Sequence, residues 1–291
     1  MDPDLQEAAR AIARVAATPP PPSRVFHPLI PGPGGLQAAA IDGSHAVLVD
    51  NGAIWAVAVR AACVTWPGPR TQPPTRIHAT TPAAAQGLLD DAFAVVGLEA
   101  PRASSAEAWA EALRSLAEFN AIQQAVMRPG TVLVDGALRG LPRHAQAMAD
   151  RIEAAAHPHT VVIGVSKRSA IEADGVPLAA WLQRNGPAGC WAVDVAAGSY
   201  VARLHDRAQH AFRIDAPDLA AVARLLPSCR DAAYVGYPYP LAVAHNAVAL
   251  TGTEVADLRG RLSNEVRKAG GAGAAGLMQD FHDVLDRNVP R

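Results

Sequence analysis

Apolar positions between residues 36 and 66 follow the short spacings of β-strands. An apolar run from Ala38 to Ile41 leads to Asp42, and a second apolar piece covers residues 45–49. Asn51-Gly52 is then a turn signal, and a longer apolar run extends to residue 66. The pattern predicts a meander of antiparallel strands, and the proline-rich residues 67–82 predict a loop after it.

The middle of the chain changes to helices that alternate with short apolar strands. Ser104 and Glu107 match the S-x-x-E capping box, which predicts a helix that begins there and ends before Pro129-Gly130. The elements expected next are a strand ending at Asp135, a helix over about residues 141–156 and a strand over residues 160–166. Such alternation predicts parallel strands.

The last third returns to β-patterns and ends in helices. The elements expected are strands at residues 190–195, 199–204 and 210–215, a helix over about 217–226, and a helix from a second capping box, Thr251 with Glu254, to Val266. Residues 2–17 predict an amphipathic helix. We expect a helix and proline-rich linker over residues 1–35, one main domain over 36–269 and a glycine-rich tail over 270–291.

This order of elements is that of the ribonuclease H-like fold. The expected class is therefore α/β, with a mixed sheet that combines an antiparallel meander with parallel strands and is flanked by helices. In such a sheet the first strand and a later parallel strand lie side by side, so acids at corresponding positions of the two strands meet.

Composition and charge exclude several other classes. The chain has 291 residues, of which 50% are hydrophobic and 18% charged, enough for a packed core. It has no apolar run of membrane-spanning length and no signal-peptide pattern at its start, so we expect a soluble, cytoplasmic protein. Three distant cysteines predict reduced core thiols. The net charge of −1 excludes a polybasic nucleic-acid binder, and the preference for arginine over lysine fits phosphate binding or a GC-rich genome.

Two Asp-Gly pairs follow apolar runs, at Asp42 and at Asp135. A turn explains either pair alone. Two carboxylates that meet repel each other unless a cation neutralises them, and an oxygen-rich site of this kind suits Mg²⁺ or Mn²⁺. Such an ion serves phosphodiester hydrolysis.

A second group of polar side chains lies in the segment GYPYPLAVAHN. It holds Tyr237, Tyr239 and His245, with Pro238 and Pro240 restricting the backbone. A lone histidine is usually a hydrogen-bonded structural residue, and a proline-tyrosine alternation often marks only a rigid loop.

Taken together, the segments AIDGS, VLVDGAL, IGVSK and GYPYPLAVAHN resemble the NurA nuclease family over roughly residues 36–250. The resemblance implies a bacterial NurA-type protein with a ribonuclease H-like core and Mn²⁺-dependent nuclease activity on DNA. It also implies a homodimer that works with the HerA hexameric ATPase, a DNA translocase, in DNA end resection and double-strand break repair.

Carried over by position, the resemblance assigns catalytic roles to five residues: Asp42, Glu118, Asp135, Tyr237 and His245. Metal ligands for one or two Mn²⁺ or Mg²⁺ ions would be Asp42, Glu118, Asp135 and His245, with Glu111 as the alternative to Glu118. Tyr237 would bind the scissile phosphate. The N-terminal linker and the C-terminal tail match nothing in the family.

Candidates for contacts to the DNA backbone are Arg139, Arg143, Lys167 and Arg168, although a solvated charged surface explains each of them equally well. The expected function is a metal-dependent deoxyribonuclease that cuts single strands as an exonuclease or endonuclease. The alternatives are another ribonuclease H-like phosphodiesterase, acting on RNA or branched DNA, and a noncatalytic DNA-binding adaptor of a translocase.

Overall fold

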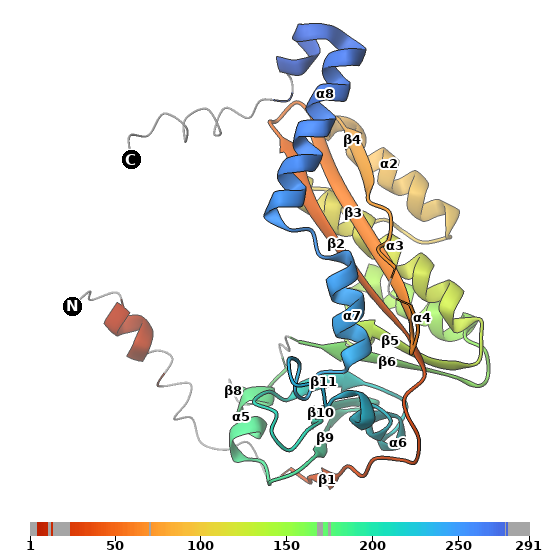
Figure 1. Ribbon diagram of the computed structural model, residues 1–291, viewed down its shortest axis with the longest axis vertical. Coiled ribbons are helices and arrows are strands. Elements are labelled where there is room, and N and C mark those ends of the chain that lie inside the picture. Colours follow the sequence, from red (N-terminus) through yellow and green to blue (C-terminus); the bar gives the residue numbers. More distant parts are fainter. Residues whose placement is uncertain are drawn as a thin grey trace.

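A computed structural model of the chain describes residues 5–10, 13, 24–69, 71–167, 171–173, 176–276 and 278 (Figure 1). A nine-stranded sheet forms its centre, with the strand order β1-β9-β10-β11-β6-β5-β2-β3-β4. The strands are β1 (His27–Pro28), β2 (Ala38–Asp50), β3 (Trp55–Trp66), β4 (Arg76–Thr80), β5 (Gly130–Asp135), β6 (Thr160–Ser166), β9 (Trp191–Ala196), β10 (Ser199–Arg203) and β11 (Phe212–Asp215). A separate short pair joins β7 (Glu172–Ala173) to β8 (Val176–Pro177).

Strands β2, β3 and β4 form the expected antiparallel meander. β2 pairs with β3 over nearly its whole length, and the turn between them is closed by the Asn51 side chain. Its Oδ1 accepts from the backbone N–H groups of Ala53 at 3.2 Å and Ile54 at 3.0 Å, which is how asparagine favours turns. β4 pairs with the first half of β3.

Strands β5 and β6 continue the sheet in parallel orientation. β5 pairs with β2 on one side and with β6 on the other. These strands are ordered β4-β3-β2-β5-β6 in the sheet, with β2, β3 and β4 antiparallel and β2, β5 and β6 parallel. This arrangement confirms the ribonuclease H-like mixed sheet expected from the sequence.

Helices cover both faces of this sheet (Figure 1). They are α2 (Pro82–Val95), α3 (Ala106–Val126), α4 (Arg143–Ala155), α5 (Leu178–Asn185), α6 (Leu219–Ala223), α7 (Tyr239–Val248) and α8 (Gly252–Gly276). Side chains that alternate along each strand enter two different cores. Ile41 and Val132 pack with α2, α3 and α4 on one face, whereas Ala40 and Leu133 pack with α6 and α7 on the other.

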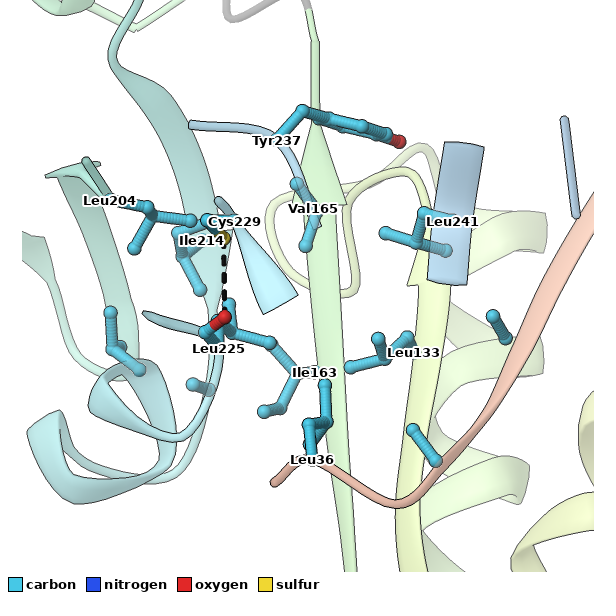
Figure 2. Close-up of a cluster of buried hydrophobic side chains, with 14 of the residues drawn as sticks. Leu36, Leu133, Ile163, Val165, Leu204, Ile214, Leu225, Cys229, Tyr237 and Leu241 are labelled. Carbon is cyan, nitrogen blue, oxygen red and sulfur yellow. Dashed lines mark hydrogen bonds between the residues drawn. The ribbon is translucent and has the colours of Figure 1, made fainter. Parts of the chain in front are cut away.

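Figure 2 shows part of the α7 core, in which Leu133, Ile163 and Val165 of the parallel strands meet Leu241 of α7. Tyr237 lies at the upper edge of this cluster in the view (Figure 2). Within this core the Cys229 thiol donates to the carbonyl of Leu225 at 3.2 Å. The apolar contacts pack helix α7 over β2 and β5.

Helix α8 packs against the half of the β2–β3 ribbon that extends beyond β5. Leu258 contacts a small cluster that includes Leu48 and Ala56. The capping box at its start is confirmed, because Glu254 accepts from the N–H of Thr251 at 3.0 Å and the Thr251 hydroxyl accepts from the N–H of Glu254 at 3.2 Å.

Several expectations about local structure were wrong. Residues 76–80 form strand β4 inside the expected loop, because a neighbouring strand edge pairs their backbone. Ser105 caps α3, accepting from Ala108 N–H at 3.1 Å, and Glu107 instead contacts His45. The segment from Tyr239 onward forms helix α7, which the sequence pattern did not predict. Cys63 is exposed rather than buried.

The ends of the chain also differ in detail from expectation. His27–Pro28, inside the expected linker, adds strand β1 to β9. Helix α8 continues past residue 270, so the first glycines of the expected tail are helical. Of the helix expected over residues 2–17, only residues 5–10 and 13 are described, and they are helical. No helix in the described part of the chain is both long and apolar enough to cross a membrane.

Candidate metal and catalytic site

Asp42 and Asp135 lie side by side on neighbouring parallel strands. The last paired residues of β2 and β5 are Ile41 and Val134, and the two aspartates are the next residues of their strands. Both side chains point to the face that α7 covers, because they follow Ala40 and Leu133 by two positions. β5 ends at Asp135 whereas β2 continues, so the pair lies where the parallel part of the sheet stops.

Helix α7 brings His245 to this pair. Nδ1 of His245 lies 2.8 Å from Oδ2 of Asp42, and the other carboxylate oxygen of Asp42 accepts the backbone N–H of Gly43 at 2.7 Å. One ligand atom from each of Asp42, Asp135 and His245 lies within 4.8 Å of the others. The sequence-predicted residues of three separate elements are therefore brought to one point.

Tyr237 precedes α7 and lies beside the same acids. Its ring packs against Phe212 with a centroid distance of 5.4 Å, and its buried hydroxyl has no hydrogen-bond partner among the described residues. Burial is the main cause that raises the pKa of Tyr237, and the charges of Asp135 and Asp42 raise it further. The hydroxyl therefore keeps its proton and is a hydrogen-bond donor beside Asp135.

Glu118 reaches the site from the opposite face of the sheet. It lies on α3 beneath Gly43, and a Cβ built on Gly43 would come within 2.7 Å of the Glu118 Cγ. The missing side chain of Gly43 is thus what lets the carboxylate approach Asp42. Glu118 does not belong to the group of three residues whose ligand atoms are within 4.8 Å.

Arg114 holds Glu118 in place. Its Nη1 lies 2.5 Å from Oε1 of Glu118, one helical turn away, and its other nitrogens contact Glu111. Glu111 also lies 3.5 Å from His45. Of the two glutamates considered from the sequence, Glu118 is therefore the one beside Asp42, and Glu111 lies farther along α3.

Burial and the repulsion of neighbouring carboxylates raise the pKa values of Asp42 and Glu118. The pKa of Asp42 is raised by burial and then by the charge of Asp135, against the contact with His245. The pKa of Glu118 is raised to about 7, chiefly by burial and, despite Arg114, by the charge of Asp42. Such a cluster gains from a bound cation.

The residues present fit a hard divalent ion. Carboxylate oxygens together with an imidazole suit Mn²⁺, and carboxylates suit Mg²⁺. The Tyr237 hydroxyl has no hydrogen-bond partner among the described residues and lies close enough to Asp135 and Asp42 for their charges to raise its pKa.

The four candidates for DNA contacts are placed differently. Lys167 is ion-paired with Asp135. Arg139 is directed away, with its Nη2 3.4 Å from Glu153, and Arg143 is the exposed first residue of α4. Arg168 lies outside the described residues.

Sequence reasoning missed three supporting residues. Arg114 stands four positions before Glu118 on the same helix, and this spacing was a usable signal. Gly43 was considered only as the second residue of an Asp-Gly pair, for which a turn was the alternative explanation. Asp215 is fully buried and accepts the backbone N–H groups of Leu138 at 2.8 Å and Arg139 at 3.1 Å, which fixes the loop after Asp135. No local pattern indicates that long-range contact.

Comparison with known proteins gives a structural match alone. No protein-family model and no curated protein sequence matches the chain. A crystal structure of NurA superposes with a TM-score of 0.58 at 10% identity, covering 94% of this chain and 99% of that one. The NurA nuclease from Sulfolobus solfataricus gives 0.56 at 12% identity, covering 91% and 95%. NurA bound to dAMP and manganese gives 0.51 at 10% identity, covering 90% and 94%.

This chain has the fold of NurA. The resemblance to NurA read from the sequence is thereby confirmed at the level of structure. Because the match extends over about nine-tenths of the chain, the NurA fold describes the whole sheet and its helices rather than one part of them.

Proposed function

We propose that this protein is a divalent-metal-dependent nuclease that hydrolyses phosphodiester bonds of DNA. The observation that carries the proposal is the convergence of Asp42, Asp135 and His245, whose ligand atoms lie within 4.8 Å of one another. This convergence occurs on a chain with the fold of NurA, one structure of which is bound to dAMP and manganese.

Asp42, Asp135 and His245 would hold the ion, and Glu118 would reach it from the α3 side. The ion, Mn²⁺ or Mg²⁺ and one or two in number, would supply electrostatic stabilisation to the phosphate and activate water for attack. Tyr237 would donate a hydrogen bond from its hydroxyl to a phosphate oxygen. The hydroxyl keeps its proton because burial and the two aspartates raise its pKa. Arg114 keeps Glu118 oriented toward Asp42.

The biological setting follows from the same resemblance. We propose a cytoplasmic homodimer that acts on single-stranded or processed DNA ends, supplied by a HerA-like hexameric ATPase during end resection and double-strand break repair. Support comes from the NurA-like strand order and from the resemblance of the sequence motifs to that family. A noncatalytic adaptor would have no physical reason to keep buried acids close together, since unpaired buried charge is costly.

The test is digestion of an end-labelled single-stranded oligonucleotide by the purified protein with Mn²⁺, Mg²⁺ or EDTA. We expect cleavage with the ions and none with EDTA or with Asp135→Asn. Asp50→Asn is the matched control, because Asp50 is an exposed aspartate at the far end of β2. Undiminished cleavage in EDTA or in Asp135→Asn would refute the metal mechanism, and no cleavage by the wild type, alone or with a HerA-like ATPase, would favour the adaptor.

A further inference from the structure

Lys167 is placed at the centre of the site although the ligand set does not include it. It follows β6, and its ammonium group is hydrogen-bonded to Oδ2 of Asp135. The same nitrogen lies 5.3 Å from the centroid of the Tyr237 ring. Among the described residues it is the one lysine or arginine whose charged group is paired with an aspartate of the site.

The exposure of the two partners shows that this contact is open to substrate. The Asp135 side chain is 11% exposed, whereas that of Lys167 is 40% exposed. Lys167 therefore covers the aspartate from the solvent side, the side from which a polyanion arrives. In the free protein the ammonium group balances part of the negative charge that Asp135 and Asp42 bring together.

A competition for Asp135 follows from this geometry. A divalent ion held by Asp42, Asp135 and His245 would draw on the same Asp135 carboxylate that Lys167 now contacts. The ammonium group would then be left over the Tyr237 ring, with hydrogen-bond donors that have lost their carboxylate acceptor. A cationic donor in this position is a suitable partner for a non-bridging phosphate oxygen.

We propose that Lys167 is a further catalytic residue, which neutralises Asp135 in the free protein and binds a non-bridging oxygen of the phosphodiester in the complex. The inference rests on the proposed nuclease function and specifies the part of the substrate that Lys167 contacts. No covalent step is involved, because the ammonium group exchanges one anionic partner for another. Lys167 directly follows the end of β6. That end is held against β5 by parallel pairing as far as Asp135 and Val165.

The composition of the chain allows a direct test. Its only two lysines are Lys167 and Lys268, so protein labelled with ¹³C-lysine gives two side-chain signals, assigned with Lys268→Arg. Lys268 lies on α8, paired with Glu265, and serves as the internal control. The probe is oligothymidylate added to the Asp135→Asn protein in EDTA, where Lys167 has lost its carboxylate partner and cleavage is not expected.

We expect the Lys167 signal to shift with the phosphodiester oligonucleotide and to stay unchanged with the same oligonucleotide carrying neutral methylphosphonate linkages. The Lys268 signal should not move with either. A Lys167 signal that does not respond, or that responds equally to both oligonucleotides, would overturn the proposal. This readout does not depend on cleavage, so it remains informative even if the protein proves to be inactive as a nuclease.

Kinetics provide the second test. We expect Lys167→Gln to lower kcat/KM for DNA at least tenfold and, because Asp135 is released, to lower the Mn²⁺ concentration needed for half-maximal activity. Lys167→Arg should restore part of kcat/KM, and Lys268→Gln should change neither quantity. If Lys167→Gln cleaves with wild-type kcat/KM while Asp135→Asn is inactive, the inference fails and the nuclease assignment stands.

Discussion

His245 and Asp42 are 203 positions apart in the chain and are joined by a contact of 2.8 Å between Nδ1 and Oδ2. The contact attaches the last turn of α7 to the middle of β2. It also orients the imidazole ring, because a ring nitrogen bound to a carboxylate fixes which nitrogen remains for another ligand.

His245→Ala should therefore reduce catalysis far more than stability. The His245 side chain is 53% exposed, so its loss should cost no more than about 1 kcal/mol of unfolding free energy. Mn²⁺ affinity, measured by calorimetry, should fall by roughly 10- to 100-fold if the ring is a ligand or orients one. His210→Ala, at another exposed histidine, is the control. Unchanged Mn²⁺ affinity in His245→Ala would remove this residue from the site.

Gly43→Ala tests the passage through which Glu118 reaches Asp42. The added Cβ would lie 2.7 Å from the Glu118 Cγ, so the glutamate must move away. We expect strongly reduced cleavage with a stability loss of about 1–3 kcal/mol from overpacking. Gly87→Ala on α2 is the matched control, because nothing lies within 4 Å of its added Cβ. It should cleave normally and gain up to about 1 kcal/mol in helix stability. Normal cleavage by Gly43→Ala would show that Glu118 has no part in the reaction.

The raised pKa of Glu118 predicts an unusual pH dependence of stability. The folded-state pKa is about 7 and the ordinary value is 4.5, so between these values the folded protein binds more protons than the unfolded chain. Metal-free protein should therefore lose stability as the pH rises from about 4.5 to about 7, by on the order of 3 kcal/mol from this group.

Denaturant unfolding in EDTA across this pH range measures the effect. Glu118→Gln should remove most of the decline, whereas Glu265→Gln on the exposed surface of α8 should leave it intact. Added Mn²⁺ should stabilise the wild type more at pH 8 than at pH 5, since it binds the charged carboxylates. A decline of equal size in Glu118→Gln would assign the pH dependence to other groups.

Much of this architecture was readable in the sequence because its signals are local. Apolar runs ending in Asp-Gly predicted β2 and β5, and parallel pairing then placed Asp42 beside Asp135. The Thr251–Glu254 capping box likewise needs only four consecutive residues. The fold class followed from the order of such elements.

What the sequence did not reveal depends on contacts between distant segments. β4 exists because β3 offers a free edge, although its own residues have little strand character. The expected capping box of Ser104 with Glu107 is replaced by a cap from Ser105, and Glu107 contacts His45, which lies 62 positions away in the chain. The role of Gly43 depends on the position of α3, which lies some 60 residues or more away along the chain.

Tyr237→Phe separates a catalytic hydroxyl from a structural one. The hydroxyl is buried and has no hydrogen-bond partner among the described residues, so its removal relieves an unsatisfied polar group. We expect the variant to be as stable as the wild type or up to about 1 kcal/mol more stable, with the ring still packed on Phe212. If the hydroxyl donates to the phosphate, kcat should nevertheless fall by roughly 10- to 1000-fold.

Tyr200→Phe is the control. It removes a hydroxyl from a tyrosine of similar overall burial on β10 and should cleave normally. Stability from denaturant unfolding and kcat from oligonucleotide cleavage should thus change in opposite senses in Tyr237→Phe. A parallel loss of both would show instead that the hydroxyl supports the fold, and unchanged kcat would exclude it from the reaction.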